Sequence, residues 1–259
     1  MSKRFATIIV SAFFIVLASS APFDSAVSQN VFAAAAPPSK NDLDALLEAK
    51  DWTRLGPALL PPRDPVSLGR ILDWLHAKLD NGAGFMVAFS YMRNLWVAGS
   101  ALNVEDTEKD MRVTAGMIGL YNTYELTVID GAKCEDRSAP DNRVHQLLTL
   151  NPATFSFLKS RPTALKTKIV LVALAFEKRT ALLRSHDDLI CRDGLDQMRA
   201  GLQRGTQTEV PNTSGHVGRT VAVTPPPHWV PKLVPPATYI PMQNAARATM
   251  QGNLLKLIE

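Results

Sequence analysis

Hydrophobic residues recur at helical spacings over most of the chain between residues 39 and 204. The clearest example begins at Asp64-Pro65 and ends at Asn81-Gly82, and its apolar stripe comprises Leu68, Ile71, Leu72, Leu75 and Leu79. Asp before Pro is a typical helix start, and Asn-Gly is a typical helix end. The pattern predicts an amphipathic helix with one buried face. Ser39 and Asp42 predict a capped start for a shorter helix near the beginning of this region.

Two consecutive segments, 84–102 and 106–131, are predicted helices, and the first, together with the second from Val113 onward, is apolar on most sides. A helix of this kind is usually buried. Polar side chains interrupt both segments near their middles, which argues against a membrane span. Because helices adjacent in sequence usually pack together, we expect an antiparallel pair in the core.

The polar side chains on this helix pair are candidate ligand-binding residues. They are Tyr91, Arg93, Asn94, Tyr121, Asn122, Tyr124 and Glu125. Arg and Glu are rarely buried without partners, so an antiparallel arrangement would favour pairing of Arg93 with Glu125. One interpretation is a structural ion pair, with hydrogen-bonded tyrosines, that sets the helix register. The other is a pocket in which Glu125 acts as a base or Arg93 binds an anion.

The second half of the chain changes character after residue 204. Helical patterns continue through 144–150, 160–183 and 188–204, but eight prolines fall between Pro211 and Pro241. We expect an extended Pro-rich arm over 205–241 that packs on a helical bundle over 36–204, followed by a helix over 242–259. The alternative for the arm is a polyproline ligand of a partner protein. The predicted fold is all-α: a single-domain bundle of six to eight helices.

The N-terminal 35 residues have the layout of a secretory signal peptide. A short cationic start, Met1–Arg4, precedes an apolar run, Phe5–Ala18, and small residues follow. We favour cleavage between Ala33 and Ala36 over cleavage after Ala21, where Pro22 follows. The sequence therefore predicts a periplasmic or secreted protein without a membrane span in the mature chain. The alternative is an uncleaved segment that anchors the protein to the inner membrane.

Export determines how the two cysteines are interpreted. Cys134 and Cys191 lie 57 positions apart, and in an oxidising compartment they most simply form one disulfide. Closing such a loop stabilises the fold by about 4 kcal/mol in the chain-entropy model. A redox pair would usually have C-x-x-C spacing, and a metal site would need further ligands nearby.

Charge and motifs give little support for nucleic-acid binding or catalysis. The formal net charge is +4, and no run of Lys and Arg forms a basic stripe. The sequence holds no nucleophile elbow, phosphate loop or H-E-x-x-H pair. His186, Asp187 and Asp188 are contiguous at a helix start, where capping explains them better than a metal does. His76 and His145 are isolated, and no role is predicted for them.

These observations favour a non-catalytic periplasmic protein that binds an unknown protein or small ligand of the cell envelope. No cofactor, metal or nucleic acid is expected. The alternative is a periplasmic enzyme with a buried polar pocket around Arg93 and Glu125.

Overall fold

The computed structural model describes residues 38–102, 104, 106, 109–184, 187–212 and 219–259. Within these ranges the chain forms ten α-helices and one two-stranded sheet, which confirms the all-α prediction, although with more helices than expected. By its internal contacts the described chain divides into two compact units, residues 196–229 and the remainder. The predicted signal peptide, residues 1–35, lies outside the described residues.

The larger unit begins with three helices whose starts follow the predicted capping. They are α1 (Lys40–Glu48), α2 (Trp52–Ala58) and α3 (Pro65–Asp80). Ser39 and Asp42 form a capping box at the start of α1. Asp64 accepts a hydrogen bond from the backbone nitrogen of Ser67 at 2.9 Å at the start of α3. Both capping predictions are confirmed.

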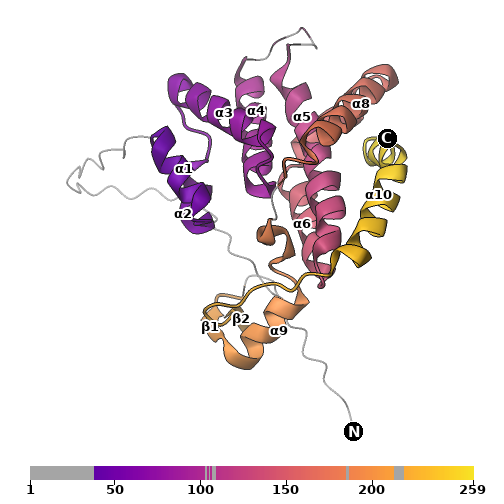
Figure 1. The fold of residues 1–259 in the computed structure, drawn as a ribbon. Helices are drawn as coiled ribbons and strands as arrows, with labels where there is room; N and C mark the ends of the chain where they lie inside the picture. The colour runs from indigo at the N-terminus through magenta and orange to yellow at the C-terminus, as the bar shows by residue number, and fades with distance from the viewer. Residues whose placement is uncertain (1–37, 103, 105, 107–108, 185–186, 213–218) are drawn as a thin grey trace, which may run out of the picture. The chain divides into compact units, whose positions relative to one another are not determined.

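The two mostly apolar segments form α4 (Phe85–Leu102) and α5 (Met111–Tyr121), which lie side by side (Figure 1). They are antiparallel. A Cβ atom at Gly99, late in α4, would lie 2.7 Å from the backbone nitrogen of Arg112, early in α5. A Cβ atom at Gly119, late in α5, would lie 3.2 Å from the sulfur of Met92. The predicted antiparallel pairing is confirmed, and Gly99 permits the close approach.

The sequence predicts one regular helix that continues to residue 131, but the structure departs from α geometry after Tyr121. The helix widens into a π-helix, η1 (Asn122–Ile129), and then tightens into a 3₁₀ turn, η2 (Asp130–Lys133). Two threonine hydroxyls bond backbone carbonyls here: Thr123 donates to Gly119 at 2.8 Å, and Thr127 donates to Thr123. Because these bonds compete with the regular ladder, threonines at this spacing favour a departure from α geometry.

Five further helical elements complete the larger unit: α6 (Ser138–Leu150), α7 (Pro152–Lys159), α8 (Thr163–Thr180), η3 (Asp188–Cys191) and α10 (Pro236–Leu257). Helix α8 packs on α5, and α10 packs on α8 and on η1 (Figure 1). Asp187 caps η3 by accepting a hydrogen bond from Leu189, as its position predicts. His186 lies outside the described residues.

The region predicted as an extended arm, 205–241, contains regular structure. Strands β1 (Thr206–Val210) and β2 (Thr220–Thr224) form an antiparallel hairpin with Thr206 opposite Thr224. In this smaller unit α9 (Leu195–Arg204) lies against the hairpin, because Gly201 faces Val223. Helix α10 begins at Pro236 rather than at residue 242, since a proline is readily accepted in the first turn of a helix.

Cys134 and Cys191 form the predicted disulfide, and both are nearly inaccessible to solvent. Cys134 also pairs with Leu233 in an isolated β-bridge. On either side of it, Glu135 donates to the carbonyl of Lys232 at 3.0 Å, and Val234 donates to that of Lys133 at 2.9 Å. Three distant segments of the larger unit therefore meet at the bridge.

None of the helices in the described part of the chain has the length and apolarity that crossing a membrane requires.

We expect the double substitution of Cys134 and Cys191 by Ala to lower the free energy of unfolding by about 4 kcal/mol, because the 57-residue loop becomes free in the unfolded chain. Denaturant unfolding of the variant and of oxidised wild-type protein measures the difference. Unreduced wild-type protein should show no reactive thiol after denaturation. Two titratable thiols, or equal stability, would contradict the expectation.

Candidate functional site

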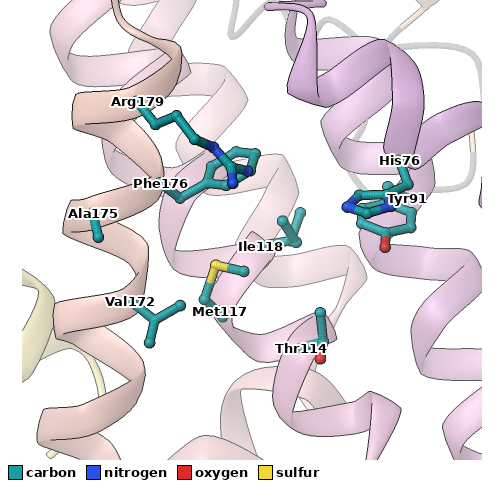
Figure 2. A pocket seen from close by; sticks show the side chains of 9 residues that line it. All are labelled: His76, Tyr91, Thr114, Met117, Ile118, Val172, Ala175, Phe176 and Arg179. Carbon is teal, nitrogen blue, oxygen red and sulfur yellow. The ribbon is translucent and has the colours of Figure 1, made fainter.

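A groove runs along α5 between α4 and α8, and we call it the central groove (Figure 2). Its volume is about 350 Å³. It is lined by His76, Tyr91, Thr114, Met117, Ile118, Val172, Ala175, Phe176 and Arg179. Figure 2 shows the side chains of α8 on one side, those of α3 and α4 on the other, and those of α5 between them.

The middle of the central groove is apolar. Met117 and Ile118 come from α5, and Val172, Ala175 and Phe176 come from α8. Across from them, the rings of His76 and Tyr91 stack with centroids 5.8 Å apart and an angle of 11° between their planes. The groove therefore combines aliphatic and aromatic surfaces, which is the usual lining of a small-molecule site.

One end of the central groove carries charge. The guanidinium of Arg179 on α8 meets the carboxylate of Asp80 at the end of α3 at 2.6 Å, so this ion pair joins the two walls. The Nε2 atom of His76 lies 3.4 Å from the same carboxylate. Arg179 also lies over the Phe176 ring, 4.9 Å from its centroid. Because Arg179 and Asp80 are partly exposed, their pairing contributes at most about 1 kcal/mol.

Tyr91 places a hydroxyl group in the central groove. Burial, together with the negative charges of Asp80 and Asp73, raises the pKa of Tyr91. The phenol therefore stays protonated and can donate a hydrogen bond. Figure 2 shows its hydroxyl pointing down the groove toward Thr114.

Arg93 lies away from Glu125, and the predicted pairing of the two residues is wrong. Arg93 is exposed on α4, and its guanidinium lies 5.8 Å from the centroid of the Phe89 ring. It lines a smaller pocket of about 250 Å³ between α2 and α4, together with Pro57 and Leu60. A partner for Glu125 comes instead from the residues that follow α8.

That partner is Arg184, which is buried among three carboxyl groups. Its Nε atom lies 2.7 Å from Asp130, and its Nη2 atom lies 3.2 Å from Glu177 and 3.7 Å from Glu125. The four side chains, Glu125, Asp130, Glu177 and Arg184, are at most 10% exposed, and we call them the buried charge cluster. Within the described ranges, no group of three or more His, Cys, Asp or Glu side chains could hold a metal ion.

Two partly exposed cations flank the buried charge cluster. Lys133 lies 3.2 Å from Asp130, and Arg247 of α10 lies 3.1 Å from Glu177. With Arg184 they give three cations to three carboxyl groups. Ion pairs therefore link η2, α8 and α10, and the contact of Glu125 with Arg184 adds η1.

Glu125 is the least solvated member of the buried charge cluster, with 1% of its side chain exposed. Burial, followed by the negative charge of Glu177, raises the pKa of Glu125 to about 9 despite Arg184. Glu125 is therefore protonated at neutral pH. Burial alone would lower the pKa of Arg184, but the charges of Asp130 and its neighbours outweigh burial and raise it. Neither described pocket includes Glu125. We therefore interpret the protonated Glu125, next to Arg184, as part of the packed interior.

The remaining predicted ligand-binding residues are spread over the larger unit. Asn94 is buried and donates to the carbonyls of Leu59 and Ser90 at 2.9 and 2.8 Å. The Tyr121 ring packs edge-on against Phe176, 4.9 Å between centroids. Tyr124 donates to the carbonyl of Ala246 in α10 at 3.2 Å.

Asn122 is fully buried on η1, and its side chain has no hydrogen-bond partner among the described residues. Of the seven candidates, Tyr91 lines the central groove and Arg93 lines the smaller pocket. Ligand binding by these residues stays a prediction.

Sequence reasoning missed the charged end of the central groove. His76 was an isolated histidine without a predicted role, and Arg179 was one of several charged residues in a helix. Asp80 and Arg179 are 99 positions apart, so only the packing of α3 and α8 around α5 brings them together. Spacing in the sequence carried no signal for this pair.

Comparison of the chain with protein-family models, with curated proteins and with solved structures finds no match in any of the three.

We expect replacement of Arg184 by Met to lower the free energy of unfolding by about 3–5 kcal/mol, because the buried carboxylates of Asp130 and Glu177 lose their shared cation. Replacement of Arg179 by Met is the matched control and should cost no more than about 1 kcal/mol, since its ion pair is exposed. Denaturant unfolding at neutral pH measures both. Equal losses in the two variants would mean that Arg184 has no special role.

We expect Glu125→Gln to change how stability depends on pH. The ordinary pKa of this carboxyl group is 4.5, and in the folded protein it is about 9. Below pH 4.5 both states hold the proton. As the pH rises toward 9 only the unfolded state releases it, so wild-type stability falls by up to about 1.4 kcal/mol per pH unit from this group.

The Gln variant lacks this titration. Its free energy of unfolding should match that of wild type near pH 4.5 and exceed it at pH 8, as measured by urea unfolding across that range. The variant Glu135→Gln serves as the control, because Glu135 is half-exposed and should leave the pH profile nearly unchanged. Parallel profiles for Glu125→Gln and wild type would show that Glu125 is ionised in the folded protein.

Proposed function

We propose that this protein is an exported, non-catalytic binding protein that takes a small, largely apolar ligand in the central groove. The observation that carries the proposal is the lining of the groove. Aliphatic residues of α5 and α8 face the stacked rings of His76 and Tyr91 across about 350 Å³. This volume lies near the lower end of the range of about 300–1,000 Å³ that small-molecule sites occupy.

The composition of the central groove favours binding over catalysis. Its titratable side chains are His76, Tyr91 and Arg179. His76 turns Nε2 to Asp80 and stacks its ring on Tyr91, and Tyr91 keeps its proton. A nucleophilic mechanism needs a hydroxyl or thiol within hydrogen-bond reach of a base. Among the described residues, the contacts of His76 are with the Asp80 carboxylate and the face of the Tyr91 ring, and neither places a base at a hydroxyl of the groove.

Export is supported by two independent features. The first 35 residues have the charge and hydropathy pattern of a signal peptide. The disulfide between Cys134 and Cys191 is of a kind that persists in oxidising compartments. Together they favour the periplasm or the extracellular space.

The alternative function, an enzyme that uses Arg93 and Glu125, has less support. Arg93 is exposed beside Phe89, whereas Glu125 is buried against Arg184. A shared reaction site would need both groups at one cavity. The buried charge cluster is better explained as a structural element of the bundle.

We expect the neutral fluorescent probe N-phenyl-1-naphthylamine to bind the folded protein with an increase in fluorescence. Ala175→Trp should weaken this binding at least about tenfold, because Ala175 lines the groove and an indole there would occupy it. Ala175 is exposed, so the variant should fold. Fluorescence titration measures the affinity, and circular dichroism checks the fold.

Ala164→Trp is the matched control for Ala175→Trp. Ala164 is an exposed alanine of the same helix, three turns away and outside the groove. Its affinity for the probe should equal that of wild type. Failure of the wild-type protein to bind the probe, or equal binding by Ala175→Trp, would contradict a ligand site in the central groove.

A further inference from the structure

We propose that the ligand of the central groove is a monocarboxylic acid with a compact apolar body, and that Arg179 binds its carboxylate. This inference rests on the proposed function, because it assumes that the groove is the binding site. Beyond the proposed function, the inference specifies the charge of the ligand, its orientation in the groove and the residues that recognise both.

The first argument is the unused hydrogen-bonding capacity of Arg179. A guanidinium group has five N–H donors on three nitrogen atoms. The Nη2 atom meets Asp80 at 2.6 Å, and no hydrogen bond from Nε or Nη1 is found within the described part of the chain. Arg179 can therefore bind a second carboxylate without releasing Asp80.

The second argument is the orientation of that guanidinium. It lies over the Phe176 ring, 4.9 Å from the centroid, and Phe176 is itself part of the wall. Figure 2 shows Arg179 extending from α8 over Phe176 toward the space between the helices. The Phe176 contact and the Asp80 pair hold the cation at the groove from two sides. A held guanidinium loses less conformational freedom when it binds an anion.

The third argument is how the remaining polar groups are arranged. Beyond Arg179 the groove is lined by Met117, Ile118, Val172 and Ala175, which favour an apolar body. The Tyr91 hydroxyl faces this space and keeps its proton, so it is a donor. Arg179 brings a permanent positive charge to this space, which favours an anionic group on the ligand, and the hydroxyls of Tyr91 and Thr114 can donate to that group.

The acidic groups near this end of the groove must also be considered. Asp80 belongs to α3, and Asp73, one turn or more earlier on the same helix, acts on Tyr91. Asp80 is paired with Arg179 at 2.6 Å and lies 3.4 Å from Nε2 of His76, so its negative charge is partly offset. Asp73 is exposed, and solvent screens its charge. The negative charge of Asp80 should nevertheless oppose an anionic ligand, which gives the test a residue with the opposite effect from Arg179.

The test compares ligands that share one apolar body and differ in charge. The probes are 2-naphthoate, its neutral amide 2-naphthamide, and the cation 2-naphthylmethylamine, each titrated by calorimetry at pH 7.5. Octanoate is a fourth probe that distinguishes a chain-shaped acid from a ring-shaped one. We expect 2-naphthoate to bind at least about fivefold more tightly than the amide, as a charge-assisted hydrogen bond to Arg179 predicts. The amine should bind most weakly of the naphthalene probes.

Two variants separate charge recognition from a general effect on the groove. Arg179→Gln should abolish the preference for 2-naphthoate and leave the affinity for the amide within about twofold of wild type. Asp80→Asn should increase the preference for 2-naphthoate, because it removes the opposing charge while Arg179 remains. If the Asp80–Arg179 pair only held the walls together, both variants would change affinity in the same direction for all probes.

The outcomes distinguish this inference from the proposed function. Equal binding of 2-naphthoate and the amide, or tightest binding of the amine, would overturn the carboxylate inference and leave the groove as a binding site. Lack of binding by all four probes would overturn both. Tighter binding of octanoate than of 2-naphthoate, with both affinities lowered in Arg179→Gln, would support the carboxylate contact and overturn the compact shape of the apolar body.

Discussion

The packing of the larger unit depends on the burial of one guanidinium group, that of Arg184. A buried cation without partners is too costly to persist in a folded protein. Arg184 meets this constraint with Asp130 from η2 and with Glu177 from α8. Each contact requires a particular register between neighbouring elements, so the charges restrict which packing arrangements of these apolar helices are acceptable.

The π-helix η1 belongs to the same constraint. It carries Glu125 toward Arg184, and it is the segment on which α10 packs. π-Helical turns are rare overall. They occur mostly as local interruptions of α-helices, which change the direction in which the following side chains point. The π-helical backbone and the buried carboxyl group of Glu125 therefore occur in the same segment, next to Arg184.

An aromatic layer separates the buried charge cluster from the central groove. Phe176 lines the groove and packs edge-on against Tyr121, and the Tyr121 hydroxyl lies 3.4 Å from that of Thr180. Helix α8 thus carries Phe176 and Arg179 at the groove, while Glu177 and Thr180 face the interior. The same helix can line the central groove and contribute to the buried charge cluster because adjacent positions on it point in different directions.

Much of the fold was predictable because the signals for it are local. The caps at Ser39 and Asp64, the antiparallel pair of apolar helices, and the disulfide all follow from short patterns or from residue type. The site was not predictable in the same way. Sequence reasoning identified Glu125 as a buried charge but paired it with Arg93, because no periodicity records that η1 packs beside the segment after α8, which carries Arg184.

The same limit explains the other errors. A single helical period could not anticipate the change of pitch at Asn122, and the proline content after residue 205 concealed a hairpin and an earlier helix start at Pro236. These features arise from hydrogen bonds and contacts between residues distant in sequence. The central groove is the feature that local sequence patterns predict least, because its lining residues come from four helices.

The ion pair of Arg247 with Glu177 makes the buried charge cluster depend on a residue that lies far along the chain. This cation reaches Glu177 from α10, which begins at Pro236 and is synthesised after all the residues of the buried charge cluster. A nascent or truncated polypeptide that stops before α10 has its acidic interior groups but lacks one of their counter-ions and the cover over η1. Such a fragment lacks a counter-ion for Glu177 however well its earlier helices form, so it would remain accessible to proteases until α10 docks.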